Sequence, residues 1–112
     1  MRTMEINTAQ EFFETALSNR FKPEKAKDIH VTVQVSLTGN NPSDWIITIK
    51  DQKIQVIQGT IKESMLAFKT SENVFLDLVN GKLSIENAFF SGKINFKGDI
   101  MTALKLKETG FI

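Results

Sequence analysis

Cysteine and tyrosine are both missing from the 112 residues of this chain, and histidine occurs only once. The lack of cysteine excludes disulfide bonds, thiolate zinc sites, iron–sulfur clusters and cysteine nucleophiles. The single histidine, His30, falls on the polar side of an alternating stretch and has no candidate partner near it in the sequence. We therefore interpret it as a solvent-facing side chain, and we expect no catalytic residue, no metal site and no cofactor.

Neither sign of charge dominates, because 14 basic and 13 acidic residues give a net charge of +1. Nucleic-acid-binding proteins usually carry a clear basic excess, since neutralising phosphates supplies most of their affinity. We therefore expect no nucleic-acid partner. Basic residues are in slight excess only near the C-terminus, where four lysines predict at most a weak contact with an anionic membrane surface: Lys93, Lys97, Lys105 and Lys107.

Long apolar runs are also missing, and none approaches the roughly 20 residues that a bilayer-spanning helix needs. The first residues contain no apolar segment typical of a secretory signal, and Gly110-Phe111-Ile112 is not a peroxisomal tripeptide. A chain of this length predicts one domain over residues 1–112, and we expect it to be cytoplasmic.

Helical and strand patterns alternate along the chain in an order typical of an α+β protein. A capping box formed by Thr8 and Glu11 predicts an amphipathic helix over 8–21, and Pro23 begins a short second helix. Strands are expected at 29–37, 45–50, 54–60, 64–70 and 93–97, the first four as an antiparallel meander, with helices at 72–79, 84–90 and 100–107. These elements predict a five-stranded, mostly antiparallel sheet with helices packed on one face.

Apolar side chains are dense after residue 74, which leaves two interpretations open. They form a filled core, or the three later helices do not collapse fully onto the sheet and leave an apolar cavity, for which a lipid-sized ligand needs about 300–1,000 Å³. Periodicity alone does not distinguish a filled interior from a hollow one.

Three motifs in the C-terminal half resemble the signature of the sterol carrier protein type-2 family. They are Gly81-Lys82-Leu83-Ser84, then Ala88-Phe89-Phe90-Ser91-Gly92-Lys93-Ile94, then Gly98-Asp99-Ile100-Met101. Upstream, Trp45-Ile46-Ile47-Thr48-Ile49-Lys50 and the stretch 68–75 are similar to a strand and a strand–helix junction of that family. The resemblance covers nearly the whole chain in the same order.

The resemblance implies helices that enclose an apolar tunnel and a protein that binds and transfers a fatty acid, fatty acyl-CoA, phospholipid, isoprenoid or sterol, without a cofactor or covalent chemistry. By position, it implies a tunnel lined by Phe75, Leu78, Val79, Phe89, Phe90, Ile94, Phe96, Met101 and Leu104. The chain stops soon after Lys107, which predicts a free-standing, prokaryotic-like member and makes acyl chains, quinones or isoprenoids the expected ligands. The alternative is an accessory module of the same fold that serves a lipid- or quinone-biosynthesis partner.

Overall fold

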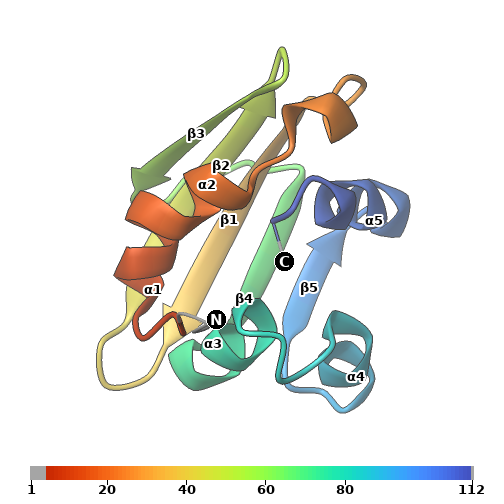
Figure 1. Cartoon of the computed structure of the whole chain (residues 1–112). Coiled ribbons are helices and arrows are strands. Elements are labelled where there is room, and N and C mark those ends of the chain that lie inside the picture. The colour runs from red at the N-terminus through yellow and green to blue at the C-terminus, as the bar shows by residue number, and fades with distance from the viewer. Residues whose placement is uncertain (1–4, 112) are drawn as a thin grey trace.

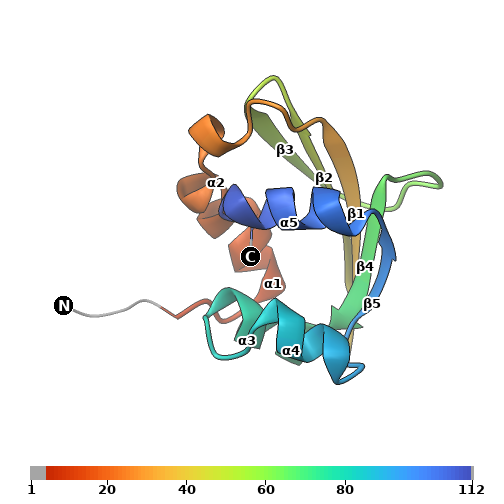
Figure 2. The ribbon, with the colours of Figure 1, turned by 90° about the vertical axis from the view of Figure 1, so that its right-hand side faces the viewer.

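A five-stranded sheet forms the frame of the molecule, and helices cover one of its faces (Figures 1 and 2). The computed structural model describes residues 5–111; residues 1–4, on which part of the expectation about a secretory signal falls, and Ile112 lie outside the described part. In chain order the elements are α1 (Ala9–Glu11), a π-helical turn (Phe12–Ala16), α2 (Leu17–Arg20), a 3-10 turn (Pro23–Lys25), β1 (Val31–Thr38), β2 (Ser43–Lys50), β3 (Lys53–Gln58), β4 (Leu66–Ser71), α3 (Glu72–Val79), α4 (Ile85–Phe90), β5 (Asn95–Gly98) and α5 (Ile100–Glu108).

The strands lie in the order β3-β2-β1-β4-β5, and every neighbouring pair except β1 with β4 is antiparallel. This confirms the α+β class and the mostly antiparallel sheet, but the predicted four-strand meander is wrong at β4. The segment after β3 crosses the bare face of the sheet, so that β4 pairs in parallel with β1 (Figure 2). The Gln34 side chain on β1 holds this segment, donating hydrogen bonds to the Trp45 and Gly59 carbonyls and accepting one from the Ile61 N–H.

An aromatic cluster fills the space between the N-terminal helix and the first strands. Thr8 caps this helix by accepting a hydrogen bond from the Glu11 N–H, as the capping box predicts. The π-helical turn buries two consecutive rings, and Phe13 stacks on Trp45 at 4.8 Å and on Phe75 at 5.2 Å between ring centroids. Alternate residues of β1 and β2 complete this core because successive strand side chains point to opposite faces.

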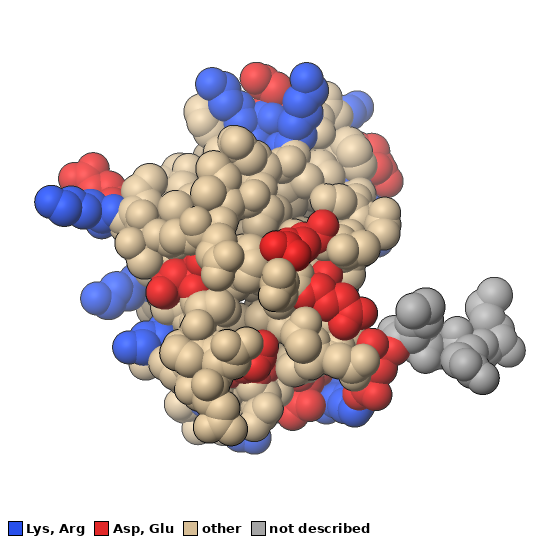
Figure 3. Space-filling view, turned by 90° about the vertical axis from the view of Figure 1, so that its left-hand side faces the viewer, with Lys and Arg blue, Asp and Glu red and all other residues tan. Residues whose placement is uncertain are grey.

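Charged side chains of both signs are spread over the β3 side of the molecule (Figure 3). Lysine and arginine gather at the end that carries the turn between β2 and β3, while carboxylates are scattered below them. Within residues 5–111, two ion pairs join segments that are distant in the sequence: Lys82 with Glu5, and Lys107 with Glu86.

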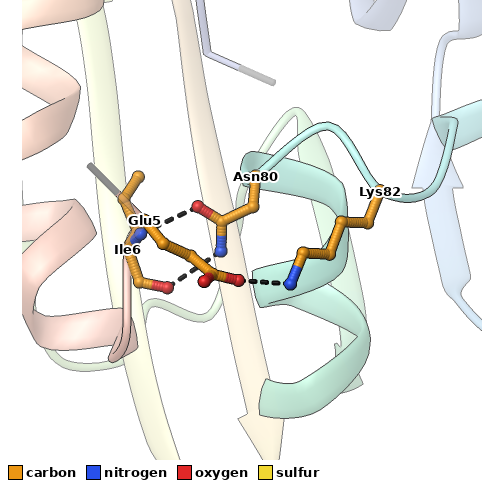
Figure 4. A network of polar contacts seen from close by, with 4 residues as sticks. All are labelled: Glu5, Ile6, Asn80 and Lys82. Atoms are coloured by element: carbon orange, nitrogen blue, oxygen red, sulfur yellow. Dashed lines mark hydrogen bonds and ion pairs between the residues drawn. The ribbon is translucent and has the colours of Figure 1, made fainter. Parts of the chain in front are cut away.

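The segment before α1 is fixed to the end of α3 by a small polar network (Figure 4). The Ile6 N–H donates to Asn80 Oδ1 and Asn80 Nδ2 donates to the Ile6 carbonyl, each at 2.8 Å. Beside them, Lys82 pairs with Glu5, and this hydrogen bond raises the pKa of Lys82 above its ordinary value. The N-terminal helix is therefore anchored to α3 at its start as well as through its aromatic rings.

Arg20 performs the same anchoring role for the end of the chain. Its Nε donates to the Gly110 carbonyl at 2.8 Å and its Nη1 donates to the Val79 carbonyl at 3.1 Å. Gly110 has a φ of +96°, and a Cβ at that position would lie 2.1 Å from the Arg20 carbonyl oxygen, so only glycine allows this approach. The next residue, Phe111, is thereby held in the interior.

Candidate functional site

An apolar cavity of about 250 Å³ lies between the sheet and the two helices α4 and α5. Its floor comes from β1, β4 and β5 together with the residue before β5, and consists of Val33, Leu66, Phe68, Ile94 and Phe96. The two helices and the C-terminal segment supply the rest of the lining: Ile85, Glu86, Phe89, Phe90, Ile100, Ala103, Leu104, Leu106, Lys107 and Phe111. Thirteen of these fifteen side chains are apolar, so the cavity suits a hydrophobic group.

Simple periodicities explain which side chains reach the cavity. Leu66 and Phe68 are two residues apart on β4, so both project from the helix-covered face of the sheet. On α5 the lining residues Ile100, Ala103, Leu104 and Lys107 recur at the three- and four-residue spacing of one helical stripe. Asp99 caps this helix by accepting from the Thr102 N–H and hydroxyl, which fixes where the stripe begins and lowers the pKa of the Asp99 carboxyl.

Helices α4 and α5 cover the β4–β5 side of the sheet in both views (Figures 1 and 2). The exposed lining residues on these two helices mark the mouth of the cavity, where it opens to solvent. Except for Leu106, the lining residues on these helices are partly open to solvent, Phe90 being 84% exposed and Ile100 59% exposed, whereas Leu66 on the floor is buried. The cavity therefore opens to solvent on the side of α4 and α5.

One ion pair crosses the mouth. Lys107 Nζ on α5 lies 2.7 Å from Glu86 Oε1 on α4, and both side chains are about half exposed. The hydrogen bond from Lys107 lowers the pKa of Glu86 below its ordinary value, so this carboxyl is ionised at neutral pH. The two residues are the charged members of an otherwise apolar lining.

Five of the nine residues predicted to contact a ligand line this cavity: Phe89, Phe90, Ile94, Phe96 and Leu104. Phe75, Leu78 and Val79 are buried in the core instead, because α3 turns its apolar face toward the N-terminal helix and β1. Met101 is 62% exposed and lies outside the lining, one residue away from the stripe that begins at Ile100. Contact of any of these side chains with a ligand remains a prediction.

Several lining residues were not singled out in the sequence. Val33, Leu66 and Phe68 are signalled by strand alternation, and Ile100 with Ala103 by the helical stripe, once the starting residue of α5 is known. Glu86 and Phe111 had no comparable signal, because only the tertiary structure places them at the cavity.

The other chemical features that the sequence raised are located as follows. Lys93, Lys97, Lys105 and Lys107 are exposed, the last of them paired with Glu86. The described residues contain no group of three or more His, Asp or Glu side chains placed to hold a metal ion. No helix within residues 5–111 has both the length and the apolar character needed to cross a membrane.

The fold and the cavity define a small α+β domain whose helices leave an apolar space against one face of a five-stranded sheet. The chain belongs to the SCP-2 sterol transfer family, whose model matches residues 10–109. This confirms the family resemblance carried by the glycine and phenylalanine motifs.

Curated relatives contain this domain as a part of longer chains. Sterol carrier protein 2 of Homo sapiens is 29% identical over 70 residues, which are 62% of this chain and 13% of that protein. Peroxisomal multifunctional enzyme type 2 of Mus musculus is 36% identical over 70 residues, with 62% and 10% covered. Hydroxysteroid dehydrogenase-like protein 2 of Xenopus laevis is 27% identical over 110 residues, covering 96% of this chain and 26% of that protein. This chain thus spans between a tenth and about a quarter of these relatives.

Solved structures of low sequence identity share the fold. A domain in a double mutant of the sec-alkyl sulfatase PisA1 has a TM-score of 0.81 at 17% identity, covering 92% of this chain and 16% of the sulfatase. Palmitated SCP2L2 from Aedes aegypti has a TM-score of 0.68 at 22% identity, with 91% and 93% covered. The ubiquinone synthesis protein UbiJ-SCP2 has a TM-score of 0.61 at 12% identity, with 91% and 81% covered.

Proposed function

We propose that this domain binds a lipid with its apolar chain in the cavity between α4, α5 and the sheet, and transfers it within the cell without covalent chemistry. The observation that carries the proposal is the nearly uninterrupted apolar lining of the cavity. Membership of the SCP-2 sterol transfer family supports the same conclusion. Each buried CH₂ of a ligand chain is worth about 0.8 kcal/mol, so several methylenes supply useful affinity.

The size of the cavity favours a flexible chain over a rigid ring system. A volume of about 250 Å³ lies just below the usual range for ligand sites, which begins at about 300 Å³. An acyl or isoprenoid chain can place part of its length inside and leave the remainder along the exposed mouth, whereas a rigid sterol nucleus requires its whole volume at once. The palmitated Aedes structure of the same fold supports an acyl ligand. A tunnel that encloses the entire ligand remains a prediction.

Native mass spectrometry of the freshly purified protein, followed by solvent extraction, tests this proposal directly. We expect a stoichiometric lipid that leaves on denaturation. We also expect the affinity of added fatty acids to rise about fourfold per CH₂ until the chain fills the cavity, and then to level off. A protein that carries no lipid and ignores fatty acids, acyl-CoA and isoprenoids would overturn the proposal.

The alternative function, an accessory module for a partner protein, is favoured by one observation. Apolar side chains on α4 and α5 are exposed beside the cavity, among them Phe90, Ile100 and Met101. A ubiquinone synthesis protein of the same fold supports this alternative. It predicts that Phe90→Ser and Met101→Ser weaken a heteromeric complex while lipid binding is unchanged, whereas lipid carriage predicts the reverse for Phe90→Ser.

A further inference from the structure

Glu86 and Lys107 stand out because they place opposite charges on an apolar wall. Each belongs to a different helix, and their ion pair bridges the mouth of the cavity. A half-exposed ion pair typically contributes little to stability, so stabilising the fold is a weak reason for its position. The charged pair marks the place where an apolar lining meets water, which is also where the polar end of an amphiphilic ligand must lie.

Lys107 is oriented toward the cavity by its position on α5. It follows Ile100, Ala103 and Leu104 on the same helical stripe, so a chain lying along these residues ends beside the lysine. The ammonium group has three N–H donors, of which Glu86 accepts one. The other donors are available to a second anionic oxygen. Lys105, on the same helix, lies outside the lining.

We propose that Lys107 is the specificity-determining residue of the cavity, that it binds the anionic head of an amphiphile whose chain occupies the apolar lining, and that Glu86 competes with this head for the same ammonium group. The proposal rests on the proposed lipid-binding function and adds the class of ligand: one chain with a carboxylate or a sulfate at its end, in preference to an uncharged alcohol. Glu86 opposes such a ligand both by occupying an N–H donor and by like-charge repulsion.

The test measures dissociation constants of three ligands that share one twelve-carbon chain: laurate, dodecyl sulfate and dodecanol, each at a concentration below its micelle formation. Lys107→Met keeps the apolar stem and removes the charge, and Glu86→Gln keeps the shape of the competitor and removes its charge. Lys105→Met is the matched control, because it removes a lysine charge from the same helix outside the lining. Thermal unfolding of each variant confirms that it is folded.

We expect Lys107→Met to weaken the binding of laurate and dodecyl sulfate about tenfold, which is the loss typical of a charge-assisted hydrogen bond. The affinity for dodecanol should change less than about twofold. Glu86→Gln should raise the affinity for the two anions several-fold and leave the affinity for dodecanol unchanged. Lys105→Met should leave all three within about twofold, as for an exposed charge without a direct contact. A response of laurate alone would support the proposal with a carboxylate head.

Two results would overturn the proposal. If Lys107→Met lowers the affinity for all three ligands equally, the lysine stem is part of the apolar wall and does not bind the head group. Unchanged binding of the anions in both Lys107→Met and Glu86→Gln would exclude a role for the pair. If the wild-type protein binds none of the three ligands, the cavity proposal itself fails, and the head-group proposal fails with it.

Discussion

The two halves of the helix-covered face of the sheet are packed in opposite ways: the half over β1 and β2 is filled, and the half over β4 and β5 is hollow. Over β1 and β2, the N-terminal helix buries Phe12 and Phe13 against Trp45 and Phe75, with ring centroids 4.8–5.3 Å apart. Over β4 and β5, helices α4 and α5 leave a cavity of about 250 Å³. A single fold therefore combines a filled part with a hollow part, and it is the hollow part that we propose as the ligand site.

The difference follows from where the large side chains point. The π-helical turn lets two consecutive phenylalanines both face the core, although neighbouring residues of a regular helix are turned 100° apart. On α5, Leu106 is the buried residue, whereas the stripe that lines the cavity contains the small Ala103 and ends in Lys107. The side chains of α5 are therefore too small or too polar to fill the space between this helix and the sheet.

Removing one aromatic ring from each half of the sheet should affect stability very differently. Phe13→Ala should lower the free energy of unfolding by about 3–5 kcal/mol, because it leaves a large void within a stacked cluster. Phe90→Ala on the hollow side should change it by less than about 0.5 kcal/mol, since Phe90 is 84% exposed. Urea unfolding of both variants checks this. Similar losses would mean that α4 packs as tightly as the N-terminal helix.

Ligand binding should show the opposite pattern. Phe89→Glu places a carboxylate in the apolar lining and should lower the affinity for a fatty acid about a hundredfold while the protein stays folded. Ile61→Glu is the matched control, because Ile61 is 43% exposed, against 44% for Phe89, and lies outside the lining. Titration of both variants with the same fatty acid measures the effect. Unchanged uptake by a folded Phe89→Glu protein would remove Phe89 from the binding site.

Local features of this structure are predicted by the sequence better than contacts between distant residues. The alternating strands, the three capped helices after residue 70 and the glycine motifs are local signals, and they led to the correct elements and family. The segment that leads into the parallel strand β4 is held by hydrogen bonds between the Gln34 side chain and Gly59 and Ile61, 25 and 27 residues away, which no local pattern reveals. Strand order was therefore predicted less well than the strands themselves.

The candidate site was predictable only in part, for a similar reason. The apolar stripe of α3 does not indicate which neighbour it will meet, and in the structure Phe75 meets Phe12 and Phe13. On α5, Ile100 belongs to the cavity lining and Met101 does not, although the two neighbours are almost equally exposed, so the apolar pattern of the helix does not identify which of them lines the cavity. By contrast, the predicted residues Phe89, Phe90 and Phe96 do line the cavity, because α4 and β5 form two of its walls.

A smaller effect should follow from weakening the start of the wall helix α5. Asp99→Ala removes the acceptor of the Thr102 N–H and should lower the free energy of unfolding by about 1 kcal/mol. The loss should be concentrated in α5, which buries only Leu106, and should appear as faster amide hydrogen exchange there with little change in α3. Asp99→Asn keeps a capping oxygen and should lose less. Equal acceleration in both helices would mean that the two sides unfold as one unit.

The smallest effect we expect is a dependence on pH that is specific to the hollow side. Hydrogen bonds from Thr102 to Asp99 and from Lys107 to Glu86 lower the pKa of both carboxyls below their ordinary values of 3.8 and 4.5. Groups whose pKa is lowered on folding bind fewer protons folded than unfolded, so their contribution is present above the ordinary values and is lost as the pH falls through the folded ones. Urea unfolding of Asp99→Asn combined with Glu86→Gln should therefore depend less on pH below about 4.5 than that of the wild-type protein. Identical slopes in the two proteins would mean that neither Asp99 nor Glu86 contributes to the acid sensitivity.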